Sequence, residues 1–316
     1  MAPNPIGVNN PSPAPNRQAD AQAAQAGASS RPQSPKNIGA RSVASDYGNN
    51  AYYRWFPGAV PNEAKVVGSG THPLDLKHPE AKAFTNLASG AAYTDIAYKR
   101  PTHMTDAGQV YIEKVRPASG GQAYDVVAVA GSNDFADWRK NLIAWPRQSE
   151  EFGYVHAGFN DAYQALKPII EKELDPRVPV ALFGHSLGGT ISTQIGIRLQ
   201  RQGYDVRIAS TIGMPPSGGK DFAGLAAALP GLHVANETDP VAYASPYSLV
   251  PGTRTLNRQG EEVPHRGFLS LARPDLGLMA HSVPRYQESI HNHLMENPEI
   301  SPPPSRPAST ALPGAE

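Results

Sequence analysis

Short apolar runs alternate along the middle of the chain with segments in which apolar residues recur at helical spacing. The runs predict strands at residues 109–115, 124–130, 178–183, 206–212 and 232–235. The helical spacing predicts one or two helices at residues 79–98, and single helices at residues 159–174, 187–199, 221–229 and 283–295. Strands that alternate with helices in this way predict an α/β fold with a largely parallel central sheet flanked by helices.

Two segments are typical of hairpins. The runs at residues 109–115 and 124–130 are separated by Pro-Ala-Ser-Gly-Gly, which ends at Gly121. Residues 254–268, with Asn-Arg-Gln-Gly at positions 257–260, have the composition of two strands around a turn.

The two ends of the chain differ in composition from this middle part. Residues 1–47 and 297–316 are rich in Pro, Ala and Ser and poor in large apolar side chains, so we expect disordered tails around one domain at 48–296. Residues 1–47 suit either a plain flexible tail or an uncleaved export signal, because they resemble the N-termini of type III effectors. The expected localisation is secretion without a Sec signal peptide, into a host cell; the alternative is the cytoplasm.

The overall composition narrows the chemistry. The formal net charge is zero, so no electrostatic footprint indicates a nucleic-acid partner. The chain has no cysteine, which excludes disulfides, thiolate catalysis and cysteine-bound zinc. No apolar run is long enough for a transmembrane segment. We expect neither a cofactor nor a metal.

A candidate nucleophile lies between the run at 178–183 and the helix that follows. The stretch Gly-His-Ser-Leu-Gly at positions 184–188 matches the G-x-S-x-G nucleophile elbow, in which a sharp strand-to-helix turn exposes a serine above a helix N-terminus. The match predicts Ser186 as nucleophile and the Leu187 backbone N–H as one oxyanion donor. The alternative is a chance match, which the strand-to-helix context disfavours.

An orienting acid should follow the nucleophile, as in α/β-hydrolases, where the order is Ser, Asp or Glu, His. Asp239 comes just after the run at 232–235, at the edge of the sheet where ligands gather. Asp205 precedes a strand and Asp221 opens a helix, so neither suits the role. We predict Asp239 as the acid; the alternative is an ordinary Asp-Pro turn.

The general base should be a histidine further along the chain. His281 precedes the last helix, in a loop from which it can reach the sheet edge, whereas His265 falls in the predicted hairpin. His291 and His293 fall inside the last helix or past it. We predict His281 as the base; the alternative is a surface-loop histidine.

These motifs together resemble the class 3, or fungal-type, lipase family. The resemblance rests on the elbow, on Val-His-Ala-Gly-Phe at 155–159, on the Ala-Gly-Ser turn at 130–132 and on the stretches at 211–216 and 234–241. It implies an α/β-hydrolase fold over residues 80–290.

The resemblance also implies roles for residues outside the elbow. Ser132 would be the second oxyanion donor, His156 a structural turn residue, and residues 133–145 a lid with Phe135 and Trp138 on its apolar stripe. Such a stripe also suits plain core packing. The chain departs from the family where Ala130 replaces the usual Arg.

The settings of the predicted acid and base depart from the family pattern as well. Asp239 is followed by Pro-Val-Ala in place of the usual Val-Pro. His281 lies in Ala-His-Ser-Val-Pro-Arg-Tyr in place of a His-x-x-Tyr setting. Both departures bear on the acid and the base more than on the nucleophile.

Three functions agree with these residues. The first is a serine esterase, lipase or phospholipase that cleaves acyl esters of lipids through an acyl-enzyme, with transient contact at a lipid interface. The second is a catalytically silent protein that uses the lipase fold to bind a partner. The third is acyl transfer to an alcohol other than water.

Overall fold

The computed structural model of the protein describes residues 74–115, 122–131, 146–245, 247, 249–267, 276–297 and 299. All of them belong to one unit, Val43–Glu316. The tail predicted at 1–47 lies outside the described residues, as does the tail predicted at 297–316 except for residues 297 and 299. The domain boundaries therefore stay predictions.

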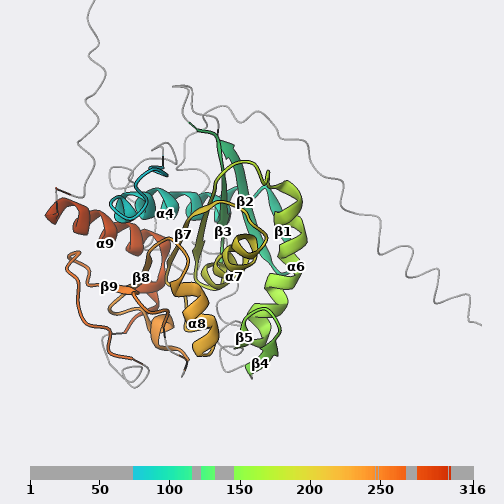
Figure 1. Ribbon diagram of the computed structural model, residues 1–316. Coiled ribbons are helices and arrows are strands. Elements are labelled where there is room, and N and C mark those ends of the chain that lie inside the picture. The colour runs from blue at the N-terminus through green and yellow to red at the C-terminus, as the bar shows by residue number, and fades with distance from the viewer. Residues whose placement is uncertain are drawn as a thin grey trace, which may run out of the picture. The chain divides into compact units, whose positions relative to one another are not determined.

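A mixed sheet, mostly parallel, organises the described residues (Figure 1). Its strands lie in the order β1 (His103–Thr105), β2 (Gly108–Val115), β3 (Tyr124–Val129), β6 (Val180–His185), β7 (Val206–Ile212), β8 (His233–Asn236) and β9 (Arg254–Leu256). The first three pair antiparallel, and every pair from β3 to β9 is parallel. The predicted α/β fold with its mostly parallel sheet is confirmed.

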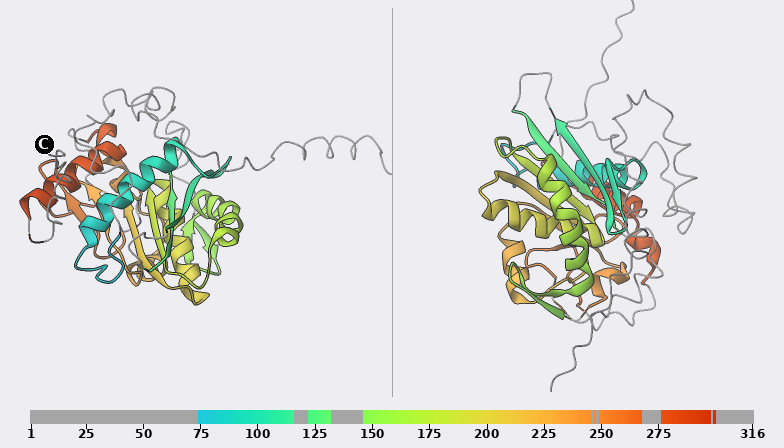
Figure 2. Two further views of the ribbon diagram at one scale, coloured as in Figure 1. Left: turned by 90° about the horizontal axis from the view of Figure 1, so that it is seen from above. Right: turned by 90° about the vertical axis from the view of Figure 1, so that its right-hand side faces the viewer.

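Helices cover both faces of this sheet (Figures 1 and 2). They are α4 (Ala83–Lys99), α6 (Ala157–Glu173), α7 (Leu187–Arg201), α8 (Lys220–Ala227) and α9 (Val283–Glu296). A separate hairpin of β4 (Pro146–Ser149) and β5 (Gly153–His156) precedes α6. The five predicted helices are present, and β1, β4 and β5 are additions that the pattern did not predict.

Alternate side chains along β3 belong to two different cores. Val126 and Ala128 pack in the core that includes α4 and α9, whereas Val127 and Val129 pack in the core that includes α6 and α7. Strands of this kind are buried on both faces, which is why they read as unbroken apolar runs in the sequence. The same burial holds for all six residues of β6.

The two predicted hairpins turn out differently. Strands β2 and β3 pair antiparallel as predicted, and their connection, residues 116–121, lies outside the described residues. The hairpin predicted at 254–268 is present next to its turn, where the Gly260 N–H donates to the Asn257 carbonyl and the Val263 N–H donates to the Thr255 carbonyl. Strand β9 also extends the parallel sheet beside β8, and the returning chain forms no named strand among the described residues but bridges β9 antiparallel, between Leu256 and Glu262.

The carboxyl ends of the parallel strands carry the candidate chemistry. Ser186 follows β6 directly, and Asp239 lies three residues after β8. In open α/β sheets this edge is where ligands bind.

Candidate active site

Ser186 occupies the sharp turn between β6 and α7. Its φ of 58° and ψ of −131° make it the one non-glycine residue with positive φ among those the structure describes. Glycines on both sides allow the turn, since a Cβ at Gly184 would lie 2.2 Å from the Gly188 carbonyl oxygen, and one at Gly188 would lie 2.2 Å from the Val129 carbonyl oxygen. The strained serine is therefore held by close backbone packing.

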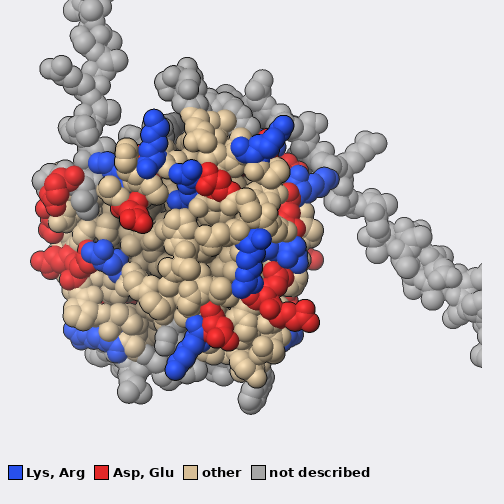
Figure 3. Space-filling model, viewed as in Figure 1, with Lys and Arg blue, Asp and Glu red and all other residues tan. Residues whose placement is uncertain are grey.

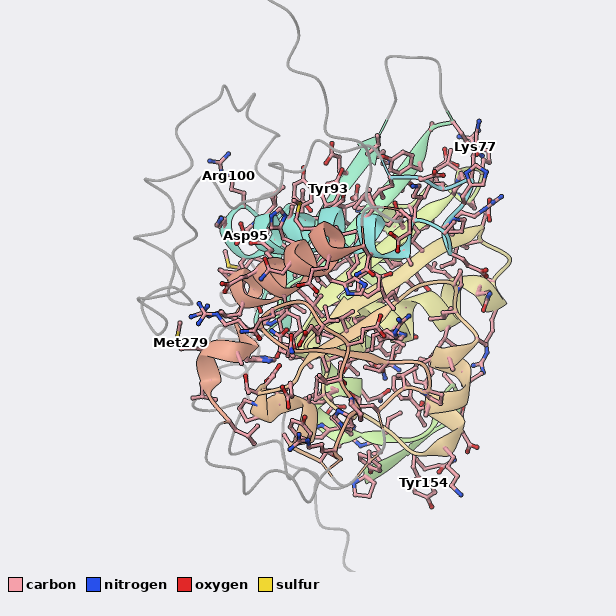
Figure 4. All side chains as sticks on the ribbon, turned by 90° about the vertical axis from the view of Figure 1, so that its left-hand side faces the viewer. Lys77, Tyr93, Asp95, Arg100, Tyr154 and Met279 are labelled. Carbon is pink, nitrogen blue, oxygen red and sulfur yellow. The ribbon has the colours of Figure 1, made fainter. Side chains whose placement is uncertain are left out.

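His281 places its imidazole against this serine. It ends the 3-10 helix η4 (Leu278–His281), which contacts α9 and is marked by Met279 in Figure 4. Its Nε2 lies 2.8 Å from Ser186 Oγ, and the ring is buried. A base within hydrogen-bond reach of the hydroxyl is the geometry that general-base activation requires.

Asp239 lies on the other side of the His281 ring. Its Oδ2 is 2.8 Å from His281 Nδ1, and its side chain is fully buried. Asp239 also caps the 3-10 helix η2 (Pro240–Tyr243), because its Oδ1 accepts the Val241 N–H at 2.8 Å. The Asp-Pro turn that was the alternative to a site role is thus present, together with the contact to His281.

Tyr286 of α9 fixes the direction of these hydrogen bonds. Its hydroxyl accepts the Asn236 N–H at 3.0 Å and donates to Asp239 Oδ2 at 2.6 Å. Burial, with the charge of Asp239, raises the pKa of Tyr286 well above its usual range, so the phenol stays a donor. Because Val241 and Tyr286 both donate to Asp239, the carboxylate suits an acceptor role toward His281 Nδ1–H as well. His281 Nε2 is then free to accept the Ser186 proton.

Comparison with known families agrees with this geometry. Residues 126–248 match the model of the family described as lipase (class 3). This segment is similar to the class 3 lipases, and the match covers less than half of the chain. The resemblance found in the sequence is confirmed, and the family supports a carboxylic ester hydrolase. Among curated proteins, none matches the chain.

Solved structures similar to this chain include fungal lipases. A triacylglyceride lipase from Rhizomucor miehei is 17% identical over 69% of this chain and 98% of that one, with a TM-score of 0.48. A lipase from Rhizopus microsporus var. chinensis is 18% identical over 79% of this chain and 92% of that one, with a TM-score of 0.45. The likeness to class 3 lipases is therefore drawn from the family match and not from these distant structures.

The structure describes only part of the predicted oxyanion hole. Leu187 is the first residue of α7, where backbone N–H groups have no partner within the helix. Ser132, Phe135 and Trp138, with the predicted lid at 133–145, lie outside the described residues. Gly131 is described, and its N–H donates to the Tyr98 hydroxyl at 2.8 Å.

The histidines that were set aside as bases have partners elsewhere in the fold. His156 caps α6 by accepting the Phe159 N–H, His265 stacks on Tyr243, and His293 contacts the Gly260 carbonyl.

The aspartates that were set aside as acids also lie away from Ser186. Asp205 pairs with Arg207 at the opposite edge of the sheet, and Asp221 lies in the first turn of α8. The structure thus brings together Ser186, Asp239 and His281, the three residues selected from the sequence.

The sequence reasoning missed the residues that support these three. Asn236 donates through Nδ2 to the Ala280 carbonyl beside His281, and Ser289 donates to Asn236 Oδ1. Tyr286 lies five residues after His281, in a stretch read only as a departure from the family pattern. A tyrosine in the apolar stripe of a helix looks like an ordinary core residue. The pattern alone therefore could not assign Tyr286 to the site.

The described residues were also searched for metal sites and membrane spans. No cluster of three or more His, Asp or Glu side chains there could hold a metal. None of the helices that the structure describes is long and apolar enough to cross a membrane. Basic and acidic groups are interspersed on the face drawn in Figure 3, in line with the zero net charge.

Proposed function

We propose that this protein is a serine hydrolase that cleaves acyl esters of lipids, with Ser186 as nucleophile, His281 as base and Asp239 as the orienting acid. One observation carries the proposal: a buried hydrogen-bonded chain runs from Ser186 Oγ through both nitrogens of His281 to Asp239. The match of residues 126–248 to the class 3 lipase model supports the ester as the bond that is cleaved.

The reaction follows from the direction of these bonds. His281 Nε2 takes the proton of Ser186 as Oγ attacks the ester carbonyl carbon, and Asp239 stabilises the imidazolium that forms. The tetrahedral intermediate then expels the alcohol, which receives the proton from His281. Water attacks the resulting acyl-enzyme with His281 again as base, releasing the acid and restoring Ser186.

The negative charge that develops on the carbonyl oxygen needs donors at the elbow. We assign this role to the Leu187 N–H at the start of α7 and to Ser132. Removing one such donor typically lowers kcat by about a hundredfold or more.

The test is hydrolysis of p-nitrophenyl esters of short and long chains, of triacylglycerol emulsions and of phospholipid vesicles. Ser186→Ala should abolish turnover. Ser192→Ala is the matched control, because Ser192 is also buried and its hydroxyl donates to the Gly189 carbonyl of its own helix. That variant should keep full turnover, and the ranking of substrates separates esterase, lipase and phospholipase.

Two outcomes would replace this proposal. No turnover by the wild type, together with no labelling of Ser186 by a fluorophosphonate, would favour the binding-protein function. Turnover that depends on Ser186 but yields a new ester when an alcohol is supplied would favour acyl transfer.

Export is a separate proposal, carried by the composition of residues 1–47 alone. We infer that this segment directs secretion without a Sec signal peptide, into a host cell. Deleting residues 1–47 should block export from the producing cell while leaving ester hydrolysis intact; unchanged export would contradict the inference and favour a cytoplasmic enzyme.

A further inference from the structure

A second buried hydrogen-bonded chain runs behind Ser186. The Gly131 N–H donates to the Tyr98 hydroxyl at 2.8 Å, that hydroxyl lies 2.7 Å from His185 Nδ1, and His185 Nε2 lies 2.6 Å from the His281 carbonyl oxygen. The chain thus joins the end of β3, helix α4, the last residue of β6 and the end of η4. It does not include any of the three side chains proposed for the chemistry.

The direction of every bond in this second chain is fixed by its two ends. A backbone N–H can only donate and a carbonyl can only accept. The hydroxyl of Tyr98, having accepted from Gly131, donates its proton to His185 Nδ1. His185 therefore carries its proton on Nε2 and donates it to the carbonyl of His281.

The surroundings of His185 favour this neutral form. The ring is fully buried, and burial, with the neighbouring His281, lowers the pKa of His185 well below its usual range. Burial likewise raises the pKa of Tyr98, so the phenol stays protonated. Neither group changes its protonation at neutral pH, so the hydrogen bonds of this second chain keep one set of donors and acceptors.

Gly131 packs closely against both Tyr98 and the nucleophile. A Cβ at Gly131 would lie 2.6 Å from the Tyr98 oxygen and 2.8 Å from Ser186 Cβ. Its backbone therefore approaches both the phenol and the serine more closely than any side chain allows. Because its N–H already donates to Tyr98, Gly131 is not available as an oxyanion donor.

We propose that Tyr98 and His185 are positioning residues that hold the oxyanion side of the site, at Gly131, and the backbone of the base, at His281, in register with Ser186. The inference deepens the proposed function and rests on it. Gly131 directly precedes Ser132, the proposed donor, so a shift of Gly131 moves that donor relative to the carbonyl of the substrate. A shift of the His281 backbone moves Nε2 relative to Ser186 Oγ.

The first test is Tyr98→Phe, which removes one hydroxyl and leaves the Gly131 N–H and His185 Nδ1 without their partner. We expect kcat to fall by about tenfold to a hundredfold with KM nearly unchanged, because misplacement by about 1 Å costs this much in the transition state. Tyr163→Phe is the matched control. Its phenol is equally buried and donates to Glu151, outside the site. That variant should keep kcat and KM.

Two substitutions of His185 separate the links of the chain. His185→Asn places an amide near the position of Nδ1 and can keep the hydrogen bond to the Tyr98 hydroxyl. His185→Gln reaches the position of Nε2 and can keep the hydrogen bond to the His281 carbonyl. We expect each to lower kcat less than His185→Ala, which removes both bonds. Circular dichroism and thermal unfolding identify any variant that fails to fold, and the comparison is then made among the folded ones.

A readout that does not depend on activity is the ring NMR spectrum of His185. Nitrogen-15 histidine spectra should show a neutral Nε2–H tautomer that does not titrate between about pH 5 and pH 8, the range in which an ordinary histidine changes charge. Tyr98→Phe should shift the His185 ring signals, and Tyr163→Phe should not.

The outcomes distinguish this inference from the proposed function. Turnover that depends on Ser186, combined with a Tyr98→Phe variant of unchanged kcat or a His185 that titrates normally, would overturn the positioning role alone. A wild type without Ser186-dependent turnover would overturn the proposed function, and the positioning role with it, even if the NMR signature of His185 were present.

Discussion

Two polar clusters tie distant parts of this chain together, and they differ mainly in their access to water. The buried cluster comprises Ser186, His281, Asp239, Tyr286 and Asn236 at the carboxyl edge of the sheet; the side chains of His281 and Asp239 are 2% and 0% exposed. The half-exposed cluster comprises the charged side chains of Glu151, Arg198 and Glu171 between the β4–β5 hairpin, α6 and α7, and the buried Tyr163 joins it through its hydrogen bond to Glu151. Its three charged side chains are 24% to 29% exposed.

The difference decides what each cluster can do. Charged groups near water gain little from pairing, because solvent already stabilises them. Groups removed from water interact strongly and cost much when a partner is lost. We therefore expect changes in the buried cluster to alter catalysis by large factors, and changes in the half-exposed cluster to alter stability slightly.

The largest effect is expected for Asp239→Asn. The amide keeps the size of the side chain but has lost the charge that orients His281 Nδ1–H and stabilises the imidazolium. We expect kcat to fall by about 10⁴-fold, as for the equivalent loss in other serine triads, measured with the best p-nitrophenyl ester.

Asp205→Asn is the matched control for that experiment. Asp205 pairs with Arg207 at the opposite edge of the sheet, and its side chain is 45% exposed. It should retain wild-type turnover. A decrease of less than about tenfold for Asp239→Asn would remove Asp239 from the proposed mechanism.

A second effect concerns a buried histidine outside both clusters. His233 lies against the Thr211 hydroxyl, with 2.8 Å between Nδ1 and Oγ1, and burial lowers its pKa from 6.5 to about 4. Between these two values the unfolded chain binds more protons than the folded one. Stability should therefore be full above about pH 6.5 and fall as the pH decreases toward 4, by about 3 kcal/mol at most from this group.

Urea unfolding at several pH values between 7.5 and 4 tests this. His233→Asn keeps a polar group near Thr211 without a titrating ring, so its free energy of unfolding should depend less steeply on pH. Equal slopes for the variant and the wild type would contradict the prediction. His185, whose pKa is also lowered by burial, contributes in the same direction to both proteins.

Burial also explains which elements could be predicted from the sequence. Strands β3, β6 and β7 were predictable because burial on both faces leaves unbroken apolar runs. The elbow was predictable because sterics allow only glycine at positions such as 184 and 188. Strands β1, β4 and β5 have three or four residues each and partly exposed side chains, so they carry no such pattern.

The supporting residues of the site were not predictable for a related reason. Tyr286 and Asp239 are 47 positions apart, and Tyr98 and His185 are 87 apart. Periodicity records which face of an element is buried, not which residue of another element it meets. Ser186, Asp239 and His281 could be selected because each follows or precedes a predicted element at the carboxyl edge of the sheet. Tyr98 and Tyr286 lie within helices α4 and α9, where they look like core residues.

A third prediction compares two tyrosines, one from each cluster. Tyr286→Phe removes the donor to Asp239 and the acceptor of the Asn236 N–H. We expect kcat to fall by about tenfold and the free energy of unfolding by about 1–3 kcal/mol, because a buried N–H and a charge each lose a partner.

Tyr163→Phe removes one donor to Glu151, which keeps a contact with Arg198 at 3.3 Å. It should lower stability by about 1 kcal/mol and leave kcat unchanged. Steady-state kinetics and urea unfolding on both variants check the pair. If both tyrosines affected kcat equally, access to water would not be what separates the two clusters.

The smallest effect is expected for Arg198→Met in the half-exposed cluster. Arg198 pairs with Glu171 and with Glu151, and the hydrogen bond that it donates to Glu171 raises the pKa of Arg198. Methionine keeps the apolar stem but has no charge, so the change isolates the ion pairs. With solvent at these groups, we expect a loss of about 0–1 kcal/mol in the free energy of unfolding, smaller still in about 1 M salt, and unchanged kcat. A loss above about 2 kcal/mol that persists in high salt would mean that this cluster behaves as a buried one.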